Sequence, residues 1–142
     1  MKKIIKRTNF CLILLTIAFA IVSCTRQESV RQPEEFLISV DSISLPDSLN
    51  IGQVMKMGFY GTIGDDQCHR FKRFIVGKNI SGYSIKAIGE QIFPKGGGCA
   101  EGAVRLEGRV LELPVTEAGT YKIEVESPGL NQIIRREVVV VP

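Results

Sequence analysis

Apolar and polar residues alternate along most of this chain, with a period of two in successive segments between residues 36 and 142. Such alternation is typical of β-strands, whose successive side chains point to opposite faces. No stretch combines the length, caps and 3.6-residue period of a helix. The sequence therefore predicts an all-β domain. Its expected strands lie within residues 36–40, 55–60, 74–76, 83–87, 104–113, 121–126 and 133–141.

Turn-forming residues separate these seven short strands. The second strand is expected to end in a turn over residues 61–66, which contains Gly61 and Gly64. The phase of the fifth changes near Gly108, which predicts a β-bulge or a break. Many short strands divided by turns favour a single antiparallel two-sheet sandwich over an open sheet.

Residues 116–121 read Thr-Glu-Ala-Gly-Thr-Tyr and precede the most regularly alternating strand. A turn ending in Gly-x-Tyr before the penultimate strand resembles immunoglobulin-like domains, in which this tyrosine bonds back across the turn. The resemblance implies an immunoglobulin-like β-sandwich of about seven strands spanning 36–142. The chain has no Trp for the core position of antibody domains. The resemblance assigns no functional residue, since the fold hosts many functions.

The N-terminus has the pattern of an export signal. Four positive charges lie in the first seven residues, and residues 10–22 form a mostly apolar run. That run is too short for a bilayer span, which needs about 20 residues. Ile21-Val22-Ser23-Cys24 then resembles the lipobox of bacterial lipoproteins. This implies removal of residues 1–23 and attachment of acyl chains such as palmitate to Cys24. The alternatives are a transmembrane anchor or an ordinary secretory signal.

Residues 24–35 are polar, contain Pro33 and predict a short flexible tether before the domain at 36–142. Lipoproteins exported to the cell surface in the Bacteroidota often carry an acidic cluster after the cysteine. Residues 25–29 hold a single acid, and no Asp follows Cys24. We therefore expect the outer membrane, facing the periplasm, with surface exposure as the alternative.

The formal charge of +3 belongs to the expected signal peptide. Without residues 1–23 the chain keeps 14 Lys and Arg against 15 Asp and Glu, a net charge of −1. This balance offers no electrostatic basis for binding nucleic acid.

Two cysteines remain after the signal peptide and Cys24 are set aside. Cys68 and Cys99 predict one disulfide, because an isolated pair outside the cytosol usually pairs. The alternative is a metal or thiol-redox site. Its spacing matches no known zinc pattern, and thiolates and carboxylates favour different metals. Its candidate residues are Asp65, Asp66, Cys68, His69 and Cys99.

Five other features have a structural and a functional interpretation. His69 is expected to be a solvated loop histidine rather than a catalytic base. Residues 96–98, three glycines, are expected to form a permissive loop rather than a phosphate loop, because a strand follows them. The basic residues are expected to form a solvated strand face, or else to meet an acidic partner or lipid phosphates. They are Arg70, Lys72 and Arg73.

Four acidic residues could include a carboxylate pair for glycoside hydrolysis, but they fit better as the polar faces of alternating strands. They are Glu107, Glu112, Glu124 and Glu126. The valines at 138–141 are expected to be buried in the sandwich; exposure on one face to a partner is the alternative.

The sequence thus favours a lipid-anchored envelope protein that acts as a non-catalytic binding or structural module without a cofactor. Its expected partners are the membrane, through the lipid, and an envelope protein or glycan. The alternative function is a periplasmic metal-binding or thiol-redox protein that uses Cys68, His69 and Cys99.

Overall fold

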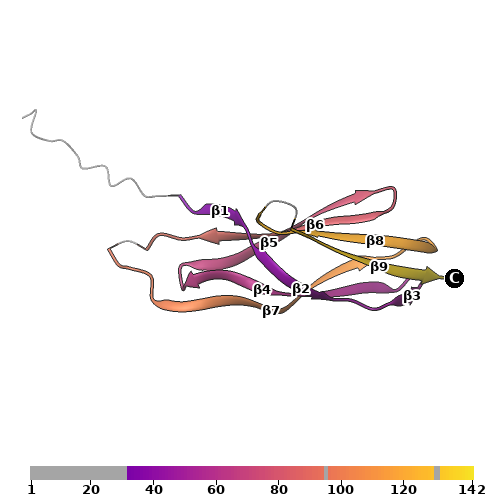
Figure 1. Cartoon of the computed structure of the whole chain (residues 1–142), viewed down its shortest axis with the longest axis horizontal. Coiled ribbons are helices and arrows are strands. Elements are labelled where there is room, and N and C mark those ends of the chain that lie inside the picture. Colours follow the sequence, from indigo (N-terminus) through magenta and orange to yellow (C-terminus); the bar gives the residue numbers. More distant parts are fainter. Residues whose placement is uncertain (1–31, 95, 130–131) are drawn as a thin grey trace, which may run out of the picture. The chain divides into compact units, whose positions relative to one another are not determined.

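The computed structural model describes residues 32–94, 96–129 and 132–142, and this part of the chain contains strands and no helix. The strands pack as two sheets (Figure 1). The predicted all-β, two-sheet architecture is therefore confirmed. The strands are β1 (Glu34–Leu37), β2 (Ser39–Ser44), β3 (Ser48–Asn50), β4 (Val54–Asp66), β5 (His69–Asn79), β6 (Gly82–Gln91), β7 (Glu101–Pro114), β8 (Gly119–Glu126) and β9 (Ile133–Val141).

The smaller sheet is antiparallel, in the order β2-β4-β7. The larger sheet is built around β6, which pairs with three strands. β5 pairs along its whole length. The other edge of β6 is divided between β8, opposite Gly82–Lys86, and β1, opposite Ile88–Gln91. From β8 the sheet continues through β9 to β3.

The expectation of a wholly antiparallel sandwich is wrong at two places, because β6 runs parallel to β8 and β3 runs parallel to β9. After β6 the chain crosses to the smaller sheet as β7, and it re-enters the larger sheet in the direction of β6. Gly82 makes the close approach to β8 possible. A Cβ atom at Gly82 would lie 1.9 Å from the carbonyl oxygen of Lys122, and its φ of 155° also favours glycine.

The strands differ from the predicted ones in number and length. The first predicted strand is divided into β1 and β2, since the chain changes sheets at Ile38, whose N–H donates to Ala87 O at 2.8 Å. β3 was not predicted, because three residues show no alternation. β4 continues to Asp66 through the expected turn. Its glycines allow close contact: a Cβ at Gly61 would lie 2.1 Å from Ser39 O.

The predicted irregularity near Gly108 is a bulge within one continuous strand. Phe59 of β4 lies opposite Arg109 and Tyr60 lies opposite Glu107, so Gly108 is the extra residue on β7. Its φ of 70° is typical of glycine in this position.

The core lies between the two sheets and consists of the inward-facing residues of alternating strands. Burial of this apolar surface is the main force that holds the sheets together. The largest fully buried side chains are Phe59, Ile38, Met55, Met57, Ile85, Ile123, Val115, Val125 and Val138.

Candidate functional site

Cys68 and Cys99 form a disulfide with a Cα–Cα distance of 5.4 Å, as predicted. Cys68 lies in the turn between β4 and β5, and Cys99 in the loop from β6 to β7. Backbone hydrogen bonds hold the same two segments together. Gln67 N–H donates to Ala100 O at 3.0 Å, and Ile92 N–H donates to Cys68 O at 2.8 Å. The disulfide therefore reinforces a contact between two hydrogen-bonded loops.

His69 is not the solvated loop residue that the sequence suggests. It is the first residue of β5, and its side chain is only 20% exposed. Its Nδ1 lies 2.8 Å from Oδ1 of Asp66, and its ring meets Phe36 edge to face at 5.5 Å. A Cβ at Gly64 would lie 2.2 Å from His69 Cγ, so the absence of a side chain there makes room for the imidazole.

The ligand atoms of Asp66, Cys68 and Cys99 all lie within 4.8 Å of one another. This group contains neither Asp65 nor His69, so the structure assembles part of the predicted metal set. Both sulfur atoms are bonded to each other, and an intact disulfide supplies no thiolate for a metal. Beside Cys99, nothing lies within 4 Å of a Cβ placed on residues 96–98, which fits the expected permissive loop.

The basic residues lie on the exposed face of β5, as expected, and two carboxylates pair with them there. Lys72 Nζ lies 2.9 Å from Glu35 and 2.7 Å from Glu90. Arg73 donates two hydrogen bonds to Glu35, at 2.9 and 2.7 Å. Arg70 Nε donates to Glu90 at 2.6 Å. We call these five residues the β1–β5–β6 ion network.

Hydrogen bonds from Arg73 and then Lys72 lower the pKa of Glu35 from its ordinary 4.5 to about 2. Those from Lys72 and then Arg70 lower the pKa of Glu90. The same contacts, first to Glu90 and then to Glu35, raise the pKa of Lys72. The network therefore stays fully charged at neutral pH, and its positive charges already have partners within the domain.

The acidic residues considered for glycoside hydrolysis lie on polar strand faces. Three of them pair with cations on neighbouring strands of the sheets, and Glu107 is exposed on β7. Such cross-strand pairs are common on solvated faces. The pairs are Lys56–Glu112 at 3.1 Å, Lys86–Glu126 at 2.7 Å and Arg135–Glu124 at 2.9 Å.

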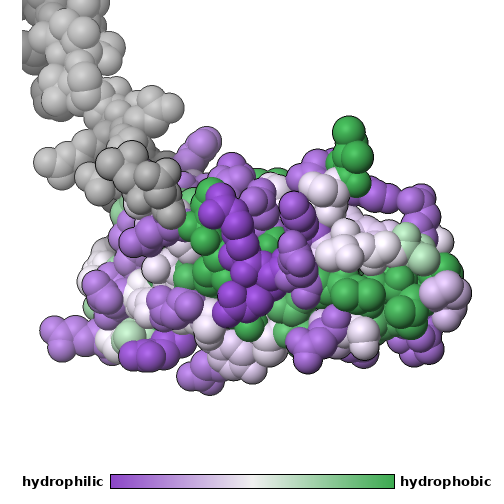
Figure 2. All heavy atoms as spheres, turned by 45° about the vertical axis from the view of Figure 1, so that its right-hand side comes forward, coloured by the Kyte–Doolittle hydropathy of each residue, from purple (hydrophilic) through white to green (hydrophobic). Residues whose placement is uncertain are grey.

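The valine run is buried on one face only, so the expectation of full burial is wrong. Val138 and Val140 lie in the core, whereas Val139 and Val141 are 45% and 41% exposed. Figure 2 shows hydrophobic residues gathered at the end of the domain where β9 ends. Exposed Ile51 and Val54 come from the chain just before and at the start of β4. The alternating burial follows from the pleat of a strand with one face in the core.

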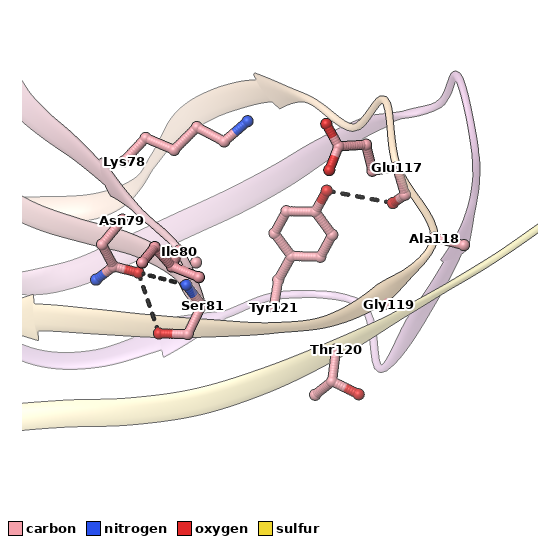
Figure 3. Close-up of a pocket in the computed structure, with 10 residues that line it drawn as sticks. Lys78, Asn79, Ile80, Ser81, Glu117, Ala118, Gly119, Thr120 and Tyr121 are labelled. Atoms are coloured by element: carbon pink, nitrogen blue, oxygen red, sulfur yellow. Dashed lines mark hydrogen bonds between the residues drawn. The ribbon is translucent and has the colours of Figure 1, made fainter.

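A hollow of about 170 Å³ lies between the turn that joins β5 to β6 and the turn before β8 (Figure 3). The first turn contributes residues 78–82 and the second contributes residues 117–121. Figure 3 shows the charged ends of Lys78 and Glu117 on the same side of Tyr121, whereas Thr120 points away.

Tyr121 is held rigidly at this hollow. Its O–H donates to the carbonyl oxygen of Glu117 at 3.2 Å, which is the bond expected of a tyrosine corner. Its ring also stacks on Tyr83, with centroids 6.0 Å apart and planes 12° apart. On the opposite turn, Asn79 Oδ1 accepts from the backbone N–H and the hydroxyl of Ser81, at 2.9 and 3.1 Å.

Sequence reasoning did not single out Lys78, Asn79 or Glu117. The available signal was the turn Asn79-Ile80-Ser81-Gly82 between two alternating strands, which places an apolar Ile80 at a hairpin tip. Ile80 is fully exposed there. The meeting of this tip with the turn before β8 depends on the parallel pairing of β6 with β8, which the strand pattern did not reveal.

Cys24 and the expected signal peptide lie outside the described residues. The described part of the chain contains no apolar helix of membrane-spanning length. Comparison with known proteins found no match to this chain among family models, curated proteins or solved structures.

Proposed function

We propose that this chain is a bacterial lipoprotein of the Bacteroidota type, whose β domain is a non-catalytic binding or structural module of the cell envelope. Anchoring is supported by Ile21-Val22-Ser23-Cys24 after a charged and apolar leader. Binding is carried by one observation, the open hollow that contains Lys78, Glu117 and the rigid Tyr121. Polar groups that converge on a concave site are typical of ligand recognition.

Two or more acyl chains on Cys24 would hold the protein stably on a bilayer, whereas one myristoyl-length chain binds only marginally. The polar tether would let the domain stand a few tens of ångströms from the membrane. The residues after Cys24 favour the outer membrane facing the periplasm.

The anchor is tested by growing cells that express the full chain with a radiolabelled palmitate. We expect label on the protein and cleavage before residue 24. Cys24→Ala should abolish both, while Cys11→Ala, which alters the other cysteine of the leader, should retain both. Label that persists in Cys24→Ala would exclude this anchor. Protease added to intact cells then distinguishes the two orientations, since a domain that faces the periplasm is protected and a surface-exposed one is cleaved.

We further propose that the domain is immunoglobulin-like. The bond from Tyr121 O–H to Glu117 O, at the start of the penultimate strand, supports this assignment. The parallel β6–β8 and β3–β9 pairs would make it a variant of that fold, whose sheets are otherwise antiparallel. An experimental structure with the same strand order but antiparallel β6–β8 pairing would show that the domain is not this parallel-paired variant of the immunoglobulin-like fold.

The second candidate is a metal or thiol-redox function, favoured by the clustering of Asp66, Cys68 and Cys99 within 4.8 Å. It requires the disulfide to open in the native envelope. The test is the intact mass of the processed protein, with Cys11 removed and Cys24 acylated, after alkylation in denaturant with and without reduction, so that Cys68 and Cys99 are its two remaining cysteines. Two added groups only after reduction indicate a stable structural disulfide. Two without reduction indicate free thiols, and metal content is then measured.

A further inference from the structure

The geometry points to one pyranose ring of an envelope glycan as the ligand of the hollow between residues 78–82 and 117–121. This inference rests on the proposed binding function and adds the chemical class of the ligand. Three properties of the hollow lead to it: its size, its charges and its aromatic wall.

The hollow holds about 170 Å³ and opens to solvent between two turns. Pockets for drug-sized ligands measure roughly 300–1,000 Å³. The space therefore suits a single small ring at the end of a longer molecule, and the open side leaves room for the rest of a glycan chain to continue into solvent.

The charges at the hollow favour no ligand with a single sign of charge. Among the described residues, neither Lys78 nor Glu117 has an ion-pair partner within 4.0 Å, although both line this hollow. The attraction of an anionic ligand to Lys78 is opposed by its repulsion from Glu117, and the reverse holds for a cationic ligand. A neutral ligand that both accepts and donates hydrogen bonds satisfies both groups.

Hydroxyl groups have this dual capacity, since each offers one donor and two acceptor sites. Neighbouring hydroxyls on one ring can accept from Lys78 and donate to Glu117.

Tyr121 supplies the apolar wall that a sugar ring needs. The C–H face of a pyranose packs on aromatic rings, and Tyr121 lies in a fixed orientation between its bond to Glu117 O and its stack on Tyr83. A preorganised wall lowers the entropy lost on binding. An aliphatic free amino acid could match the two charges, but it brings no ring face to Tyr121.

The test uses the full chain purified in detergent. It is applied to an array of immobilised glycans, followed by saturation-transfer NMR with methyl pyranosides of glucose, galactose, mannose and N-acetylglucosamine. Probe concentrations of about 10 mM cover a Kd on the order of 1 mM. We expect at least one pyranoside to bind, with its strongest saturation on ring C–H protons.

Glu117→Gln and Lys78→Met each remove one charge at the hollow, and Glu117→Gln keeps the backbone carbonyl that Tyr121 uses. Each should weaken binding roughly tenfold or more, since a hydrogen bond to a charged group is lost. The matched controls are Glu112→Gln and Lys56→Met, which make the same changes in an exposed ion pair on the smaller sheet. They should leave binding unchanged.

The inference is overturned if no pyranoside binds, if binding survives both hollow variants, or if free amino acids bind in place of sugars. Photo-reactive benzoylphenylalanine in place of Ile80 then distinguishes a failure of the glycan assignment from a failure of the proposed binding function. If no pyranoside binds but this residue cross-links an envelope protein in cells, the glycan assignment fails and the binding function stands. If neither sugar nor cross-link is found, both fail.

Discussion

The two ends of the β5–β6 hairpin treat their charged residues in opposite ways. At the end near β1, Glu35 and Glu90 form ion pairs with three cations, and the disulfide lies in the adjoining turn. At the hairpin tip, Lys78 and Glu117 have no ion partner among the described residues, and Ile80 is fully exposed. The contrast indicates that ion pairs and a disulfide tie one end together, while the polar groups at the other end stay available, as the proposed binding site requires.

The largest effect should come from the disulfide. Replacing Cys68 and Cys99 together with Ala should lower the free energy of unfolding by about 3–4 kcal/mol, because a closed loop of this length restricts the unfolded chain. Urea unfolding measures this change. The double variant Lys78→Met/Glu117→Gln at the other end should stay within about 0.5 kcal/mol of the wild type. Equal losses at the two ends would contradict the division of roles.

Gly82 lies at the hairpin tip, where it lets β6 approach β8. Gly82→Ala should lower the free energy of unfolding by about 1–3 kcal/mol, since its Cβ would lie 1.9 Å from Lys122 O and strands must shift. Gly97→Ala is the matched control, as nothing lies within 4 Å of that Cβ. Thermal unfolding of both variants checks the difference. A Gly82→Ala protein as stable as the control would argue against the parallel β6–β8 pairing.

Tyr121→Phe removes only the hydrogen bond to Glu117 O. The loss should be about 1 kcal/mol in unfolding free energy, with the ring stack on Tyr83 preserved. Urea midpoints give the value, and Tyr60→Phe, at an exposed tyrosine of the smaller sheet, serves as the comparison. Equal midpoints for the two variants would show that the corner bond adds no stability.

The smallest effect, and one that salt should reduce, comes from the ion network. The folded-state pKa of Glu35 is below its unfolded value, so its stabilisation is present above pH 4.5 and is lost as the pH falls toward about 2. The unfolding free energy should decline over this window. Glu35→Gln should flatten part of that decline. An unchanged pH slope in this variant would show that Glu35 does not contribute.

Local patterns in the sequence predicted the local features of the fold. Alternation located most strands, Gly108 marked a bulge, and two remaining cysteines indicated a disulfide. Contacts between distant segments were not predictable in this way. The partners of Arg70, Lys72 and Arg73 come from β1 and β6, so the sequence alone shows an exposed basic cluster but not the carboxylates that pair with it.

The same distinction between local patterns and distant contacts explains why the candidate site was not predicted from the sequence. A hairpin tip at residues 79–82 and a turn before Tyr121 can each be recognised in the sequence. Their meeting cannot, because it depends on the order of strands in the sheet. Glycines at 61 and 64 likewise indicate a turn in isolation, whereas in the fold they admit a neighbouring backbone and the ring of His69.

The pairing of β3 with β9 has a consequence for how this chain reaches its native state. Ser48 lies opposite Val139, so β3, near the start of the domain, cannot form this pairing until β9 has been synthesised. Domains dominated by such sequence-distant pairings fold slowly, on the order of milliseconds to seconds. The larger sheet is therefore completed only after residues 133–141 have been synthesised, so β3 stays unpaired with β9 in the growing chain until then.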